Sequence, residues 1–331
     1  MNRSNLRLAT TAGVLSLAAI LPVAALAQPV DFGKRPVRII VPFAPGGASD
    51  FVGRIIQPRL AEELGTQVLL DNRAGAAGNI GVEVAARATP DGFTLLLGNV
   101  GTMAINPSLY PDFAYKPTKH FIPVTQVVDV PGALVAHPSL QPNSVAELIA
   151  FAKANPNKLN FASPGPGSAN RIEMEILMRA AGITMTHIPY KGGAGPAVTS
   201  LIQGETQLGF VTLSSAMTFV KAGKLKMLGI VAPARNAGVP DVPTMAEAGF
   251  KSMRTGSWQG VFVPAGTPRP VVDRLFDAMQ KVMAHPDVRK RLNDGGAEVV
   301  VSKSTTDFMA FVRDENERFG RAIRDAKITA D

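Results

Sequence analysis

Four short loops rich in glycine and other small residues carry the clearest chemical signal in this sequence. They are PFAPGGASD at 42–50, DNRAGAAGN at 71–79, SPGPGS at 163–168 and PYKGGAG at 189–195. Glycine lets a ligand approach the backbone, and the free amides and positive dipole end of a helix start favour an anion. One such loop is also the ordinary tight turn between a strand and a helix. Four of them in the same topological position predict a site for a small anion such as a carboxylate.

Few residues in the sequence could catalyse a reaction or bind a metal. The absence of Cys excludes disulfides, thiolate ligands, cysteine nucleophiles and a lipid-anchored N-terminal Cys. The sequence has no Gly-Lys-Ser/Thr phosphate loop, Gly-x-Ser-x-Gly or His-Glu-x-x-His motif, and Gly75-Ala-Ala-Gly78 lacks the dinucleotide-binding spacing. The four histidines are scattered: His120, His137, His187 and His285. We therefore expect no catalytic residue, no metal and no cofactor, and no nucleophile–base pair can be assembled.

Alternating strand and helix patterns must position the four loops. A β-branched run at 37–41 predicts a buried strand, and the apolar face of 49–64 predicts a helix that Pro58 should kink. Further strands are expected at 68–70, 94–97, 124–128, 133–136, 159–162, 186–188, 207–211, 225–231 and 261–263, and further helices at 79–87, 145–155, 169–181, 196–203, 268–284 and 305–325. This alternation predicts an α/β fold whose parallel sheets bind ligands at the carboxyl ends of their strands.

Length and charge narrow the class of protein. With 331 residues, 46% of them hydrophobic, the chain can form two folded domains. Its net charge of +8 is dispersed, with Arg289-Lys290-Arg291 as the one compact cluster. Because the chain has 1 Trp and 3 Tyr to stack on bases, we expect no nucleic-acid partner. The basicity gives instead a weak attractive field for anionic solutes.

Residues 1–27 have the pattern of a secretory signal peptide. Arg3 and Arg7 precede an apolar run that ends in the small-x-small sequence Ala25-Leu-Ala27. The run is almost long enough to span a membrane, but the cleavage-site pattern and the Gln-Pro that follows favour removal. We therefore expect a mature protein in the periplasm or outside the cell.

The motifs resemble those of a known family. Residues 34–50, KRPVRIIVPFAPGGASD, resemble the opening of the Bug family, the substrate-binding proteins associated with tripartite tricarboxylate transporters. The resemblance continues at 71–79, 90–98, 106–110, 145–149, 187–193, 240–249 and 264–268, and so covers nearly the whole mature chain.

This resemblance implies an α/β, two-lobed periplasmic binding protein of type II, a Venus flytrap with a parallel-rich sheet in each lobe. Lobe 1 would comprise residues 28–128 plus 253–331, and lobe 2 residues 129–252. The ligand carboxylate would sit on the first-lobe loops, partly through ordered waters, at Pro45, Gly46, Gly47, Ala48, Ser49, Asp50, Gly75, Ala76 and Gly78. The second lobe would contribute Ser163, Gly165, Gly167, Ser168 and Tyr190. For Asp50, at a helix start, capping is favoured over contact with an anion.

Two departures from the family pattern bear on ligand choice. Thr212 stands where many relatives have Asp, and Arg171 stands where His is frequent. Loss of an acid and gain of a cation favour a second anionic group on the ligand, which predicts a dicarboxylate or an aromatic carboxylate. The alternative for Arg171 is a solvated helix face. Trp258 could stack on the ligand or fill the core at the hinge.

The function expected from these observations is a non-catalytic, monomeric periplasmic receptor. It would capture a small carboxylate and deliver it to the membrane permease of a tripartite tricarboxylate-type transporter. Two alternatives remain open: a ligand sensor for a signalling partner and, less favoured, an exported α/β enzyme.

Overall fold

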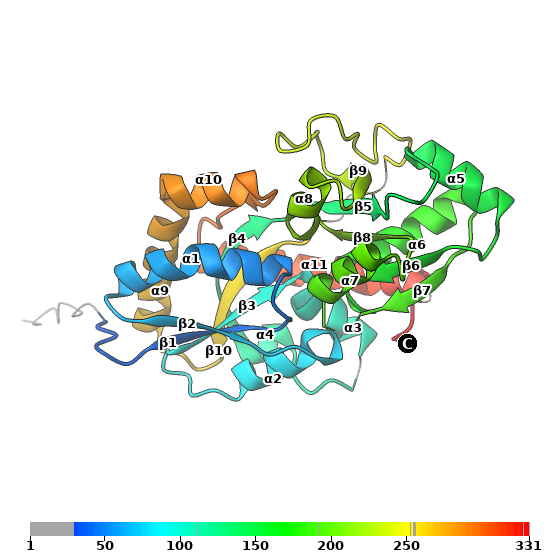
Figure 1. Ribbon diagram of the computed structural model, residues 1–331. Helices are drawn as coiled ribbons and strands as arrows, with labels where there is room; N and C mark the ends of the chain where they lie inside the picture. The colour runs from blue at the N-terminus through cyan, green and yellow to red at the C-terminus, as the bar shows by residue number, and fades with distance from the viewer. Residues whose placement is uncertain are drawn as a thin grey trace, which may run out of the picture.

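The computed structural model describes residues 30–110, 112–190, 192–251, 253, 256–326 and 328–330. The expected signal peptide, 1–27, lies outside these ranges. The chain folds into two lobes, each a twisted sheet with helices on both faces, and a cleft lies between them (Figure 1). Within the described ranges, no helix combines the length and apolar character needed to cross a membrane.

The first lobe contains a six-stranded sheet in the order β11-β4-β10-β3-β1-β2. Its strands are β1 (Val37–Val41), β2 (Val68–Asn72), β3 (Thr94–Asn99), β4 (Phe121–Asp129), β10 (Gln259–Pro264) and β11 (Glu298–Val299). Strand β1 runs parallel to β2 and β3, whereas β10 is antiparallel to β3 and β4, and β11 to β4. The parallel part therefore carries the first two predicted loops at its carboxyl edge.

Both faces of this sheet are covered, as the apolar runs require. Ile39 faces a core formed with α1 (Ala48–Leu64), α9 (Arg269–Ala284) and α10 (Pro286–Asp294). Its neighbour Ile40 points the other way, because side chains alternate along a strand. That second core includes residues of α2 (Asn79–Ala86), the π-helical turn η2 (Gly101–Ile105) and α11 (Thr305–Ala326). Shorter helical segments complete the lobe: η1 (Ala76–Gly78), α3 (Asn106–Leu109) and α4 (Pro117–His120).

The second lobe contains a five-stranded sheet in the order β7-β6-β8-β5-β9. Its strands are β5 (Gly132–Ala136), β6 (Asn160–Ser163), β7 (Thr186–Pro189), β8 (Leu208–Thr212) and β9 (Lys226–Val231). Helices α5 (Val145–Ala154) and α6 (Ala169–Ala181) pack on one face, and α7 (Ala194–Gln203) and α8 (Leu213–Lys221) pack on the other. Strand β6 is parallel to β7 and β8, and β5 is antiparallel to β8 and β9.

Two chain segments that pair with each other join the lobes. Val130 and Ser257 exchange backbone hydrogen bonds of 3.3 and 3.0 Å, and Pro131 forms an antiparallel bridge with Gly256. Next to this hinge, Trp258 is buried in the first-lobe core, where its indole nitrogen donates to Glu315. Trp258 therefore fills the core beside the hinge and does not line the cleft.

The α/β two-lobed fold class is confirmed, but the predicted direction of the strands needs correction. Each sheet is mixed, with three parallel strands and antiparallel partners. The chain enters the second lobe through β4 and β5 and returns through β9 and β10, and these strands run against their neighbours. Hydrophobic pattern alone does not reveal strand direction. Helices α8 and α10 were not predicted.

Candidate ligand-binding cleft

A small cavity lies between the lobes. The first lobe lines it with Phe43, Gly47, Ala48, Ser49, Ala77, Asn99, Val100 and Gly101, the hinge with Ser257, and the second lobe with Pro164, Gly167, Ser168, Ala169, Asn170, Ala194 and Thr212. These residues end strands or begin helices, so the cavity lies at the carboxyl edges of both parallel segments. None of them carries an ionisable side chain.

Four helix N-termini meet at this uncharged cavity. Helix α1, of 17 residues, begins at Ala48, and α6, of 13 residues, begins at Ala169. Helices α7 and α8, of 10 and 9 residues, begin at Ala194 and directly after Thr212. The first amides of a helix have no intrahelical acceptor, and the dipole places partial positive charge there. The backbone therefore makes the cavity attractive to an anion without any cationic side chain.

Asp50 holds the first loop in shape. Its Oδ2 accepts hydrogen bonds from Gly46 N at 3.1 Å and Arg54 Nε at 2.9 Å, and its Oδ1 accepts one from Asn72 Nδ2 at 3.3 Å. The hydrogen bond with Asp50 also raises the pKa of Arg54. Asn72 donates in addition to the Phe43 carbonyl at 3.0 Å. The Asp50 carboxylate is buried and committed to the loop, and it does not cap α1, whose N-cap residue Gly47 has no side-chain partner.

The second loop reaches the cavity through Ala77, a residue that was not predicted. Ala76 and Ala77 have positive φ values of 47° and 55°, and Gly78 follows with 91°. This left-handed path turns Ala77 into the cavity, whereas Ala76, Gly78 and Gly75 do not line it. A Cβ on Gly78 would lie 3.1 Å from the Phe43 ring, so Gly78 supports the first loop by close packing.

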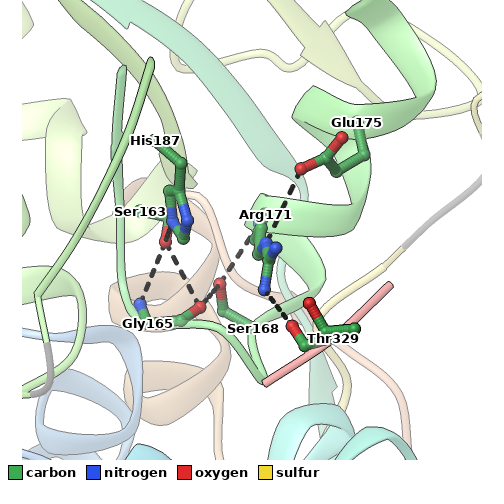
Figure 2. Close-up of polar contacts among 7 residues, drawn as sticks. All are labelled: Ser163, Gly165, Ser168, Arg171, Glu175, His187 and Thr329. Carbon is green, nitrogen blue, oxygen red and sulfur yellow. Dashed lines mark hydrogen bonds and ion pairs between the residues drawn. The ribbon is translucent and has the colours of Figure 1, made fainter. Parts of the chain in front are cut away.

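The loop between β6 and α6 is braced by side-chain hydrogen bonds (Figure 2). Ser163 Oγ accepts from Gly165 N at 3.1 Å and lies 2.7 Å from His187 Nε2. Ser168 Oγ donates to the Gly165 carbonyl at 2.8 Å and accepts from Arg171 N at 3.2 Å, which caps α6. Of these residues only Ser168 lines the cavity, beside its neighbour Gly167.

Ser163 and His187 lie in contact, and serine and histidine are residue types that act as nucleophile and base in enzymes. The sequence analysis did not bring these two residues together. Ser163 has no exposed surface, and its hydroxyl is engaged within its own loop. The His187 ring stacks on Phe161, with centroids 4.9 Å apart. A substrate in the cavity cannot reach a hydroxyl so placed, because attack requires contact with the reacting atom. The pair fixes the loop.

Arg171 lies neither in the cavity nor on a solvated helix face, which were the two predicted alternatives. Its side chain is 7% exposed, and its Nη1 donates to the Thr329 carbonyl at 2.8 Å (Figure 2). Its Nε lies 3.7 Å from Glu175 Oε1 on the same helix. The guanidinium is therefore directed to the C-terminal segment, and the reason for expecting it on a second ligand carboxylate is lost.

Of the remaining predicted residues, Thr212 lies at the cavity, whereas Tyr190, Pro45 and Gly46 lie elsewhere. Thr212 lines the cavity, and its Oγ1 lies 2.6 Å from Ser215 Oγ. Tyr190 donates to Ser200 and lies with Pro45 and Gly46 in a different hollow.

Besides Ala77, the lining residues missed in the sequence include the polar Asn99, Asn170 and Ser257 and the small Gly101, Ala169 and Ala194. Asn99 ends β3, two residues beyond the predicted strand, and its Oδ1 accepts from Thr102 N at 3.0 Å. The Gly98-Asn-Val-Gly101 run after this strand was the available signal. Asn170 lies in the first turn of α6 and donates to Glu173 at 2.8 Å.

Small residues let the backbones of the two lobes meet around the cavity. Ala44 N donates to the Gly192 carbonyl at 3.0 Å across the cleft. A Cβ on Gly195 would lie 2.5 Å from the Pro45 carbonyl oxygen, and one on Gly101 would lie 2.8 Å from that of Gly167. The lobes are thus closed on each other, and a ligand in the cavity would be enclosed by both. Within the described ranges, no group of three or more acidic or histidine side chains is placed to hold a metal ion.

The chain has two lobes that close over a cavity at helix N-termini, which is the architecture of the solute-binding receptors. The model of the tripartite tricarboxylate transporter family receptor matches residues 52–328, and the chain belongs to this family. BugT of Bordetella pertussis is 33% identical over 309 residues, which cover 92% of this chain and 94% of BugT. The resemblance to the Bug family is thereby confirmed.

Solved structures agree with this family. MatC of Rhodopseudomonas palustris, determined with bound malate, has a TM-score of 0.82 at 34% identity and covers 88% of this chain and 100% of its own. Rpa4515 of R. palustris, determined with adipate, has a TM-score of 0.87 at 31% identity and covers 90% of this chain and 99% of its own.

Proposed function

We propose that the protein is a periplasmic receptor that captures a small carboxylate and delivers it to the membrane permease of a tripartite tricarboxylate-type transporter. One observation carries the proposal: four helices of nine or more residues begin at one cavity that has no ionisable side chain. Each such terminus stabilises a nearby anion by about 0.3–1 kcal/mol, and by more where the site is buried. Ser49, Ser168, Asn99 and Asn170 add neutral hydrogen-bonding groups.

The ligand class that we favour is an aliphatic dicarboxylate. Helix α1 presents its N-terminus from the first lobe, and α6, α7 and α8 present theirs from the second, so that each wall can hold one carboxylate. No acid lines the cavity, which leaves the ammonium of an amino acid without a partner. Malate in MatC and adipate in Rpa4515 are both dicarboxylates, which supports this choice.

The remaining parts of the proposal concern location and delivery. The leader pattern of residues 1–27 and the receptor family support export to the periplasm. There the receptor would act as a monomer, because one chain supplies both walls of the cavity. Closure over the ligand would create the surface that the permease recognises.

A thermal-shift screen followed by calorimetry tests the function. The mature chain is screened against malate, succinate, adipate, citrate, benzoate and aspartate. A ligand at 100 times its dissociation constant stabilises the folded state by about 2.7 kcal/mol. We expect aliphatic dicarboxylates to give the largest shifts and aspartate little or none. Preferential binding of aspartate or benzoate would contradict the ligand class, and turnover of any compound would contradict a receptor.

A further inference from the structure

Helix α6 belongs to the cores of both lobes. Met174 and Leu177 lie in a second-lobe core between α6 and the sheet. Ala169 and Ile172, on its first turns, lie instead in the first-lobe core with Phe319 of α11. The helix that carries the ligand loop on its N-terminus is therefore also a contact between the lobes, and separation of the lobes must uncover this end.

The C-terminal segment 328–330 is held by the first lobe. It follows α11, whose Phe308, Val312, Phe319 and Ile323 are buried in the first-lobe core. Ile328 packs against the same core, and its amide donates to the Ile323 carbonyl at 3.0 Å. From this anchor the segment reaches the second lobe, where Thr329 lies beside Arg171 of α6 (Figure 2).

The contact of this segment with the second lobe is Arg171. Arg171 of α6 donates a hydrogen bond of 2.8 Å to the backbone carbonyl of Thr329, which belongs to the segment held by the first lobe. A buried guanidinium needs hydrogen-bond partners, because its desolvation is costly. The partners of this guanidinium include Thr329 and, at 3.7 Å, Glu175. When α6 moves away from the first lobe, the hydrogen bond to Thr329 must break.

A short path connects this contact to the cavity. The backbone amide of Arg171 donates to Ser168 Oγ, which donates in turn to the Gly165 carbonyl (Figure 2). Ser168 and its neighbour Gly167 line the cavity. Arg171, which holds the C-terminal segment, thus lies in the first turn of α6, and the N-cap of that helix is the cavity residue Ser168.

We infer that residues 328–330 form a strap that holds the two lobes closed, and that Arg171 is the positioning residue through which the strap acts on the ligand loop. This inference rests on the proposed receptor function. In this inference Arg171 controls the release of the ligand, whereas the sequence suggested that it contacts the ligand.

Three variants test the strap: Arg171→Met, a chain that ends at Ala326, and their combination. Lys158→Met, which removes an exposed cation from the second lobe, is the matched control. Because the wild-type chain has no Cys, Lys153→Cys and Lys290→Cys give one exposed label on each lobe, and pulsed electron spin resonance measures their separation. Stopped-flow measurement gives the release rate of adipate or malate.

The strap predicts that Arg171→Met and the truncation each lengthen the distance between the lobes in the ligand-free protein. Each should speed release at least fivefold, and the combination should do no more than either alone, because both remove one contact. Lys158→Met should behave as wild type. A truncation with wild-type distance and release would overturn the strap, as would additive effects. If neither probe binds, the proposed ligand class fails, but the label distances still decide about the strap.

Discussion

Gly167 of the second lobe lies directly against Asn106 of the first: a Cβ atom on Gly167 would stand 1.9 Å from Asn106 Oδ1. Asn106 cannot move aside easily, because it is fully buried and its Nδ2 donates to Ala77 at 2.9 Å and Asn79 at 2.7 Å. Gly167 has no positive φ, so alanine fits the conformation of the loop itself. The absence of a side chain at Gly167 is thus a requirement of lobe closure.

Gly167→Ala should therefore weaken ligand binding while leaving the fold intact. We expect affinity for malate or adipate to fall at least tenfold, which corresponds to about 1.4 kcal/mol, because the lobes cannot close fully. Calorimetry measures the affinity, and thermal unfolding of the ligand-free protein should match wild type. Gly195→Ala, which would press on the Pro45 carbonyl at 2.5 Å, should act likewise. Wild-type affinity in both variants would show that the closed arrangement is not needed for binding.

A negative charge in the cavity should abolish its preference for anions. Thr212 lines the cavity at the start of α8, and Asp is also a favourable N-cap residue, so Thr212→Asp keeps the helix start. We expect affinity for dicarboxylates to fall at least tenfold, because the new carboxylate occupies the positive end of the dipole. Thr199→Asp, at an exposed site on α7, adds the same charge outside the cavity and is the control. Equal effects of the two substitutions would argue against a carboxylate at this wall.

The role of His187 as a brace can be separated from a catalytic role. His187→Phe keeps a ring that can stack on Phe161 but removes the nitrogen 2.7 Å from Ser163 Oγ. Loss of this part-buried hydrogen bond should cost about 1 kcal/mol of unfolding free energy, and affinity should fall severalfold as the loop loosens. Urea unfolding and calorimetry check the two expectations. An unchanged affinity would mean that the loop holds its shape without this contact.

Local signals in the sequence were sufficient to place the loops. Glycine, proline and capping residues mark the ends of strands and the starts of helices within a few residues, and Gly47 and Ser168 are the N-cap residues of α1 and α6. The reach of a long side chain is not a local property. Arg171 extends to Thr329, which is 158 residues further along the chain, and no spacing within the sequence indicates that contact.

Other misses have equally physical causes. The convergence of α8 on the cavity was not predicted, because a helix of 9 residues directly after a strand gives a weak periodic signal. The mixed strand directions follow from how the chain crosses twice between the lobes, which is a property of topology. Asn99 was missed because β3 continues two residues beyond its apolar run.

The hinge contains a carboxylate whose ionisation should lower the stability of the fold. Asp129 ends β4, its Oδ1 is buried without a hydrogen-bond partner among the described residues, and Gly256 packs so closely that a Cβ there would lie 2.3 Å away. The pKa of Asp129 is raised to about 6, with burial as the largest cause. The nearby Glu298 and Glu315 also raise it, whereas the Val130 N–H and Arg318 lower it. Arg318 forms a salt bridge with Glu315 at 2.7 Å.

Because the folded state holds this proton more tightly than the unfolded state, the contribution of Asp129 to stability falls as pH rises from about 4 through 6. Asp129→Asn keeps the shape and removes the charge. We expect it to exceed wild type in unfolding free energy by up to about 3 kcal/mol at pH 7.5, with the difference shrinking toward pH 4. Urea unfolding across this range measures it. Asp241→Asn, at an exposed position, should show no such trend, and a pH-independent difference for Asp129→Asn would refute the assignment.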